Sequence, residues 1–185
     1  MKTRMIIVAA PSGAGKSSFV ERICQEDPRL EDTVTYTTRE MRQGESEGHP
    51  YHFVSREKFE QLIQNNFFIE WAKVHNNLYG TPQEQIEGAF QRNKVVIMDV
   101  DVQGVATFKA KYPDATTIFI LPPSIEELRR RVMKRDGARL KDLDVRMENA
   151  KLEMARADEF DHKIINDEFE SSYAKFKKIV EGLIG

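Results

Sequence analysis

The amino-acid sequence predicts an α/β fold, in which a parallel β-sheet core is flanked by helices. Three short apolar runs carry this prediction: MIIVAA at residues 5–10, VVIM at 95–98 and TTIFIL at 116–121. None of them alternates apolar with polar residues. Continuous runs of this kind, bounded by turn residues, are typical of strands buried on both faces of a parallel sheet. A weaker run, KIIN at 163–166, predicts a fourth strand of the same kind.

Helix start signals lie between these runs. Thr81 is an N-cap candidate, followed by a proline at the first helical position and by Glu84, and this pattern predicts a helix. Ser124 and Glu127 form a second capping box ahead of an apolar helical pattern. Strands that alternate with helices favour a core built with right-handed crossovers.

Two stretches interrupt this alternation. Residues 33–82 are polar, contain glycine and are rich in aromatic side chains, which predicts an inserted lobe. Residues 135–142 are charged and predict a second, mobile interruption.

Composition narrows the classes of function. A chain of 185 residues with 40% hydrophobic content can bury a substantial single core. Its 28 Lys and Arg nearly balance its 30 Asp and Glu, so we expect neither nucleic acid nor an anionic membrane as a partner. We expect no obligate protein partner.

Cysteine usage and apolar run length predict the compartment. The single cysteine, Cys24, excludes an internal disulfide and favours a reducing, cytoplasmic location. The apolar run near the N-terminus is too short for a signal sequence, and no run approaches the roughly 18 residues of a transmembrane helix.

A glycine-rich loop, APSGAGKSS at residues 10–18, connects the first predicted strand to a helical pattern. Strand, loop and helix in this order are the context of a P-loop, whose backbone amides and helix N-terminus face phosphate oxygens. Lys16 would reach the β- and γ-phosphates, and Ser17 would bind Mg²⁺. Ala10 stands where the usual pattern has glycine, and the alternative is a capped glycine turn with Lys16 in solvent. The residues expected to bind a nucleoside triphosphate here are Ser12, Gly13, Ala14, Gly15, Lys16, Ser17 and Ser18.

Two carboxylates, Asp99 and Asp101, follow the second apolar run. Side chains two residues apart on a strand share a face, so both carboxylates point to one side. An acidic residue at this position, Asp99, would hold Mg²⁺ through water. The alternative is an ordinary polar exit from a strand.

Further motifs occur in order along nearly the whole chain: TTREMRQGE at 37–45, Gly48, YHFV at 51–54, FIEW at 68–71, LYGT at 78–81, DVDVQG at 99–104, LPPS at 121–124, the arginines of 135–146, ADEFD at 157–161 and IND at 165–167. Together with the glycine-rich loop they resemble the guanylate kinase family of P-loop nucleoside monophosphate kinases. The resemblance implies one domain, with a core at 1–32, 83–134 and 157–185, a mixed-β GMP-binding lobe at 33–82 and a short helical lid at 135–156.

The resemblance implies that Arg39, Arg42, Tyr51 and Tyr79 hold the GMP phosphate. Arginine forks match phosphate oxygens, and tyrosine hydroxyls add neutral donors. Taken singly, these residues also suit a charged loop and half-buried aromatics.

Base selection would rest on Glu70, which the resemblance places at the guanine with Thr35, Thr81 and Asp101 assisting. Guanine offers an N1–H and an exocyclic amine on one edge, so a carboxylate can accept both hydrogen bonds. Adenine presents a lone pair at N1, which would leave the carboxylate unpaired; such sites reject the wrong substrate by about 10⁴ or more.

The implied reaction is Mg²⁺-dependent phosphoryl transfer from ATP to GMP, giving ADP and GDP, in purine nucleotide metabolism. The GMP phosphate is itself the nucleophile, so Cys24 and the four histidines need no catalytic role. The resemblance places Asn166 at the adenine, and dGMP stays open as an acceptor. The implied catalytic residues are Lys16, Arg42 and two lid arginines, Arg135 and Arg146.

Three departures from the family pattern, besides Ala10, are Met41 in place of proline, Asn76 in place of glycine, and Asp136 with Gly137 at the start of the lid. The first removes a fixed φ angle from the loop between Arg39 and Arg42. Two alternative functions stay open: a catalytically inactive, guanylate-kinase-like phosphopeptide-binding module, and a P-loop sugar-phosphate kinase, which would not need Glu70.

Overall fold

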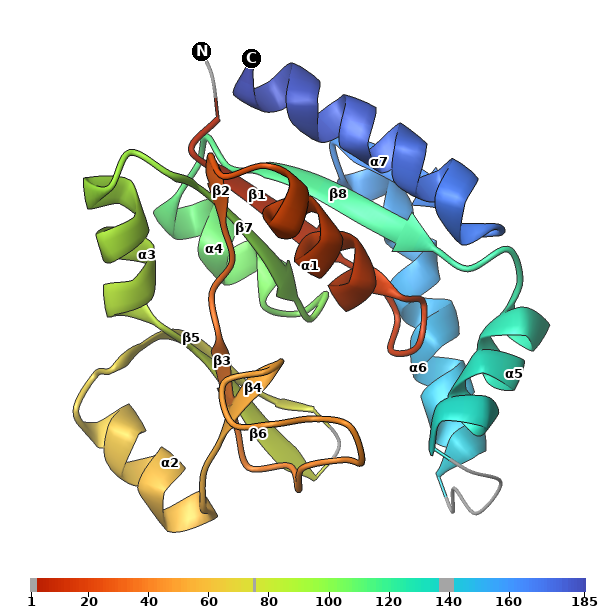
Figure 1. Cartoon of the computed structure of the whole chain (residues 1–185). Helices are drawn as coiled ribbons and strands as arrows, with labels where there is room; N and C mark the ends of the chain where they lie inside the picture. The colour runs from red at the N-terminus through yellow and green to blue at the C-terminus, as the bar shows by residue number, and fades with distance from the viewer. Residues whose placement is uncertain (1–2, 75, 137–141) are drawn as a thin grey trace.

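The computed structural model describes residues 3–74, 76–136 and 142–185, without the side chain of Asp136. Within this part of the chain, helices flank a five-stranded central sheet, and one further helix lies beside a four-stranded second sheet (Figure 1). His75 lies outside the described residues. So do residues 137–141, which include Arg139 and where the sequence predicts part of the lid.

The central sheet is parallel throughout, as predicted, because every neighbouring pair of its strands runs in the same direction. Its strands, in spatial order, are β2 (Leu30–Glu31), β7 (Val95–Val100), β1 (Met5–Ala9), β8 (Thr116–Leu121) and β9 (His162–Ile165). The three strongest apolar runs are the three inner strands, where both faces of the sheet are covered.

The helices divide between the two faces of this sheet and its flank (Figure 1). They are α1 (Lys16–Glu26), α3 (Gln83–Gln91), α4 (Val105–Lys111), α5 (Ile125–Asp136), α6 (Leu143–Ala155), α7 (Phe169–Ile184) and the short η1 (Ala157–Glu159). Alternate side chains of β1 enter two separate cores: Ile6 packs in a cluster with Phe19 of α1 and Phe176 of α7. Ile7 packs in the opposite cluster with Phe108 of α4. No helix in the described residues has the length and apolar content needed to cross a bilayer.

The second sheet is mixed, which confirms the predicted fold class. Its order is β4 (Tyr51–Phe53), β3 (Thr35–Thr37), β6 (Asn77–Pro82), β5 (Phe68–Val74), and α2 (Arg56–Gln64) lies beside it (Figure 1). Strand β3 pairs parallel to β4, and β6 pairs antiparallel to both β3 and β5. Phe59 of α2, Phe68 and Leu78 form a third apolar cluster under this sheet.

The two predicted helix starts have different outcomes. Ser124 caps α5 as predicted, because its Oγ accepts a hydrogen bond from the Glu127 amide at 3.1 Å. Thr81 does not cap α3: it lies in β6, and the N-cap position is Pro82, which has no side-chain bond. The Gln83 amide instead donates to the Phe67 carbonyl at 3.1 Å, so the second sheet satisfies the start of α3.

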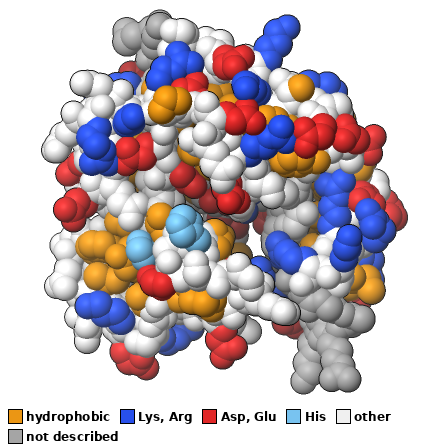
Figure 2. Space-filling view, in the orientation of Figure 1, with side chains coloured by type: hydrophobic (Ala, Val, Ile, Leu, Met, Phe, Trp, Pro, Cys, Tyr) orange, Lys and Arg blue, Asp and Glu red, His pale blue; other side chains and the backbone are white. Residues whose placement is uncertain are grey.

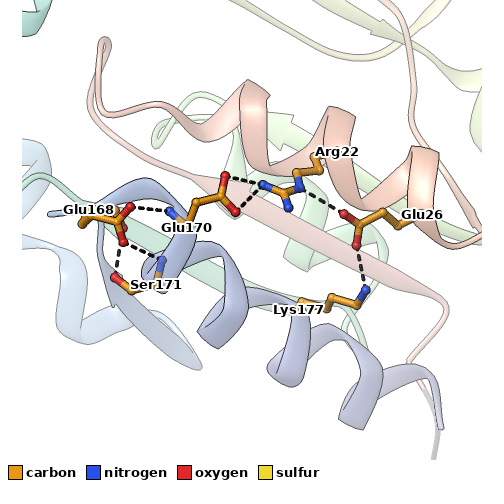
Figure 3. Close-up of polar contacts among 6 residues, drawn as sticks. All are labelled: Arg22, Glu26, Glu168, Glu170, Ser171 and Lys177. Atoms are coloured by element: carbon orange, nitrogen blue, oxygen red, sulfur yellow. Dashed lines mark hydrogen bonds and ion pairs between the residues drawn. The ribbon is translucent and has the colours of Figure 1, made fainter.

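Helices α1 and α7 are joined on their outer sides by charged contacts (Figure 3). Arg22 of α1 donates to Glu170 of α7 at 2.8 and 2.9 Å, and Glu26 accepts from Lys177 at 2.7 Å. The Glu168 carboxylate caps α7 by accepting from the amides of its first turn. These pairs are exposed and so add little stability individually. The packing of Phe19 on Phe176, with ring centres 5.3 Å apart, holds α1, which begins at the glycine-rich loop, against the C-terminal helix.

Candidate active site

A cavity of about 400 Å³ lies between the glycine-rich loop, the end of β7, the second sheet and helices α5 and α6. Figure 2 shows Lys and Arg side chains gathered on the α5–α6 side, next to a hollow in the surface. Among the candidate site residues, Ala14 and Asn166 do not line this cavity. The candidates that do are Ser12, Gly13, Gly15, Lys16, Ser17, Ser18, Thr35, Arg39, Arg42, Tyr51, Glu70, Tyr79, Thr81, Asp99, Asp101, Arg135 and Arg146.

The glycine-rich loop is held by close packing that only glycine permits. Gly13 and Gly15 have φ of +97° and +96°, a region that favours glycine. A Cβ on Gly13 would lie 2.6 Å from Cγ2 of Val132, and one on Gly15 would lie 2.9 Å from Nδ2 of Asn166. A side chain at either position would therefore disturb the loop or its neighbours.

Asn166, at the end of β9, supports this loop from the protein side. Its side chain is buried, and Nδ2 donates to the Ala14 carbonyl at 2.8 Å. Its own amide donates to the Leu121 carbonyl at 2.7 Å. The family resemblance implies that Asn166 lies at the adenine, but the sequence gives no sign of this contact, which joins residues 152 positions apart.

Ser17 and Asp99 meet at the start of α1. Ser17 Oγ donates to Asp99 Oδ2 at 2.5 Å, and Lys16 Nζ lies 3.9 Å from the same oxygen. A hydroxyl and a carboxylate are hard oxygen ligands, and Mg²⁺ commonly takes only one or two protein ligands beside phosphate and water. The donor set therefore fits Mg²⁺. In the described residues, His, Cys, Asp and Glu form no group of three or more that could hold a metal by itself.

The loop between Arg39 and Arg42 is organised by Glu45, to which sequence reasoning assigned no role. Arg39 donates to both carboxylate oxygens of Glu45, at 2.8 and 2.9 Å, and the Arg42 amide donates to Oε2 at 2.7 Å. Burial alone would raise the pKa of Glu45, but these hydrogen bonds set it below its ordinary value. The carboxylate thus constrains both sides of Met41, which stands where the family pattern has proline.

Two tyrosines lie beside this loop. The guanidinium of Arg39 is 5.3 Å from the ring centre of Tyr51, which is 5.8 Å from the ring centre of Tyr79. Burial, and then the nearby Asp99 carboxylate, raise the pKa of Tyr51 far above its ordinary value. Tyr51 therefore stays neutral and can donate a hydrogen bond into the cavity.

Glu70 lies on β5, opposite Thr81 in the pairing with β6. Burial, and then the Asp101 carboxylate, raise its pKa to about 7. A Cβ on Gly104, at the start of α4, would lie only 3.0 Å from Glu70 Oε1. Gly104 thus allows the Glu70 carboxyl to approach the central domain across the cavity.

Three arginines from the helices α5 and α6 complete the wall. Arg135 Nη2 donates to Ser12 Oγ at 3.4 Å, and Arg146 lines the cavity from α6. Arg131 also lines it. Its Nε donates to Glu127 at 2.8 Å. The i,i+4 spacing of Glu127 and Arg131 gave no sign that the arginine faces the cavity.

The parallel sheet and the mixed sheet meet at one cavity, which has the glycine-rich loop on one side and arginines on both sides. This fold and this site are those of an α/β kinase. The sequence model of the guanylate kinase family matches residues 2–183. The guanylate kinase of Bdellovibrio bacteriovorus is 62% identical over 184 residues, covering 100% of both chains. That of Polaromonas sp. is 43% identical over 176 residues, covering 95% of this chain and 85% of the relative.

A solved structure agrees with these sequence matches. The crystal structure of guanylate kinase from Anaplasma phagocytophilum has a TM-score of 0.79 and 30% identity, and the match covers 98% of this chain and 86% of that one. The chain belongs to the guanylate kinase family. The full-length match to a relative named guanylate kinase favours the enzyme over the inactive binding module.

Proposed function

We propose that the chain transfers the γ-phosphoryl group of Mg²⁺-bound ATP to GMP, giving ADP and GDP in cytoplasmic purine nucleotide metabolism. The observation that carries this proposal is that one cavity is lined both by the glycine-rich loop and by Glu70 with its neighbouring arginines and tyrosines. Such a cavity can bring a triphosphate and a guanine nucleotide together at their phosphates. The proposed division keeps the core, the GMP-binding lobe at 33–82 and the lid at 135–156.

On the ATP side, the amides of the glycine-rich loop and Lys16 would neutralise the β- and γ-phosphates. Ser17 and Asp99 would hold Mg²⁺ at their short contact, with Asp99 acting through water. When bound, Mg²⁺ supplies positive charge to the phosphate oxygens. Asn166 would serve this side by fixing the Ala14 carbonyl of the loop.

On the GMP side, Arg39, Arg42, Tyr51 and Tyr79 would hold the phosphate so that one of its oxygens faces the γ-phosphorus in line. Arg135 and Arg146 would approach the transferring group from the α5–α6 side and exclude water from it. The chain needs no nucleophile of its own. The Cys24 thiol agrees with this, because burial raises its pKa to about 12 and keeps it protonated.

Glu70 would accept hydrogen bonds from the guanine N1–H and exocyclic amine, with Thr35, Thr81 and Asp101 around the base. Thr35 and Thr81 are both buried and line the cavity, so their hydroxyls are available only to an occupant of it or to the protein. An unpaired carboxylate in this pocket disfavours adenine.

A coupled assay of ADP release, with GMP, AMP, CMP and UMP as acceptors, tests the proposal. GMP is expected to be phosphorylated at least about 10³-fold more efficiently than AMP, because only guanine pairs with Glu70. Equal rates with all four acceptors would overturn the assignment of base recognition. A parallel measurement with dGMP shows whether the ribose 2′-hydroxyl matters.

Substitution of Gly15 by alanine is expected to lower kcat/KM for ATP by at least about tenfold. The positive φ alone costs about 1–2 kcal/mol for a residue with a Cβ, and that Cβ would displace Asn166 from the loop. The matched control is Gly182→Ala in α7, where an added Cβ meets nothing within 4 Å. If both variants retained wild-type kinetics, the loop would not be the rigid phosphate site described here.

The KM for GMP is expected to fall about tenfold as the pH rises from one unit below to one unit above 7. Glu70 must be ionised to accept both guanine hydrogen bonds, and its pKa of about 7 leaves it mostly protonated at the lower pH. For the unliganded chain, the stability of the fold depends on pH in the opposite sense. Because the pKa of Glu70 is raised in the folded state, its protonated carboxyl stabilises the fold at low pH, and this stabilisation is lost as the pH rises through 7.

Steady-state kinetics over this range, in the wild type and in Glu70→Gln, isolate the effect. The GMP phosphate also titrates, with a pKa near 6, but it does so equally in both proteins. A KM profile that is identical in the two would show that Glu70 does not meet the base.

A further inference from the structure

The inserted lobe is joined to the central domain by two chain crossings that meet at the start of α3. The outgoing crossing is residues 32–34, between the end of β2 at Glu31 and the start of β3 at Thr35. The returning crossing is the direct junction of β6, which ends at Pro82, with α3, which begins at Gln83. The geometry of the guanine pocket depends on how these crossings are held, because the lobe strands that line it begin and end there.

Gln85 of α3 binds the outgoing crossing through both of its amide atoms. Its Oε1 accepts from the Val34 amide at 2.7 Å, and its Nε2 lies 3.4 Å from the Val34 carbonyl and donates to it. The short first contact fixes the orientation of the side-chain amide, because a backbone N–H needs an acceptor. A single side chain thus ties the outgoing crossing to the first turn of the returning one.

Helix α3, which carries Gln85, is fixed to the central domain. Ile86, the next residue of α3, is fully buried in the core cluster that includes Met98 of β7. Gln83 accepts a hydrogen bond from Lys111 of α4 at 3.1 Å. Because α3 is packed on the central sheet in this way, Gln85 holds Val34 to the central domain.

The side chain of Thr33, which precedes Val34 in the outgoing crossing, provides no comparable anchor among the described residues. The hydroxyl of Thr33 is buried but makes no hydrogen bond with any described residue. The Thr33 amide donates to Oδ1 of Asp32, the preceding residue, at 2.7 Å, so this bond stays within the crossing. The contact of Gln85 with Val34 is therefore well placed to determine where β3 begins.

We propose that Gln85 is a positioning residue for the GMP site, which rests on the function proposed above. It holds Val34 to α3 and so fixes Thr35, the next residue, relative to Thr81, which lies four positions before Gln85. Both threonines line the cavity around Glu70. Gln85 itself does not line the cavity and acts only through the backbone.

The test compares Gln85→Met, which keeps the side-chain length but removes both hydrogen bonds, with Gln85→Glu, which keeps the acceptor for the Val34 amide. In Gln85→Met, the KM for GMP is expected to rise about five- to tenfold, the effect of one or two lost hydrogen bonds. The kcat and the KM for ATP stay within about twofold. In Gln85→Glu, most of the GMP affinity returns. Gln91→Met is the control, because Gln91 is an exposed glutamine at the other end of α3.

Three outcomes would overturn the inference: an unchanged KM for GMP in Gln85→Met, equal losses for GMP and ATP, or no recovery in Gln85→Glu. Thermal unfolding of each variant, with and without saturating GMP, separates local displacement from loss of the fold. The wild-type chain is assayed first. If it does not phosphorylate GMP, the proposed function fails together with this inference, whereas normal wild-type turnover with an unaffected Gln85→Met overturns this inference alone.

Discussion

Replacement of Lys16 by alanine is expected to lower kcat by about 10²- to 10³-fold, with the fold retained. Lys16 is the cation of the glycine-rich loop, and its ammonium lies 3.9 Å from Asp99, which also accepts from Ser17. Charge that develops on a transferring phosphoryl group is stabilised by such fixed cations, and loss of one preorganised donor costs this much in comparable sites. Rapid-mixing or steady-state measurement of GDP formation at saturating ATP and GMP gives the change in kcat.

The matched control is Lys178→Ala on the exposed side of α7, which removes one positive charge far from the cavity. Its kinetics are expected to equal those of the wild type. The midpoint of thermal unfolding should change little in either variant, because the apolar cores contain neither lysine. Wild-type turnover in a folded Lys16→Ala protein would contradict the assignment of the loop as the ATP phosphate site.

Replacement of Glu70 by glutamine is expected to lower kcat/KM for GMP by about 10²-fold while leaving AMP nearly unchanged. A glutamine keeps the shape but turns one acceptor into a donor, which then faces a guanine donor in a half-buried pocket. A buried donor without a partner costs about 1–3 kcal/mol, and loss of a charge-assisted bond adds to this cost. The ratio of kcat/KM for GMP to that for AMP is the quantity to measure.

Glu60→Gln on α2 is the control in the same lobe, since Glu60 is exposed and lies outside the cavity. It makes the same change of charge without touching the pocket. Equal selectivity in Glu70→Gln and Glu60→Gln would show that the base is recognised by other groups.

Much of the central sheet could be predicted because its inner strands are buried on both faces. The runs at 5–10, 95–98 and 116–121 are neighbours in the structure and parallel. The edge strand β2 was missed because it has only two residues, too few for a pattern. The start of α3 was predicted with the wrong cap, because the carbonyl of Phe67 satisfies its first amide from another element.

The candidate site was predicted less evenly. The residues placed by motifs in the loop and lobe line one cavity, apart from Ala14. The contacts of Glu45 with Arg39 and Arg42 are local, but they lie in an irregular loop whose path has no sequence periodicity to predict it. The position of Arg131 at the cavity and the approach of Gly104 to Glu70 could not be predicted, because each depends on elements that meet only in the folded chain. The same holds for Asn166 beneath the loop. Sequence spacing indicates which residues share an element, but it does not show which elements meet.

The central claim is that ATP and GMP occupy one cavity with their phosphates in contact. Calorimetry with a bisubstrate compound, in which adenosine and guanosine are joined through a polyphosphate chain, tests it most directly. We predict that one equivalent binds, more tightly than either nucleotide, and that the loaded protein then takes up neither ATP nor GMP. Continued binding of either nucleotide to the loaded protein would contradict the claim.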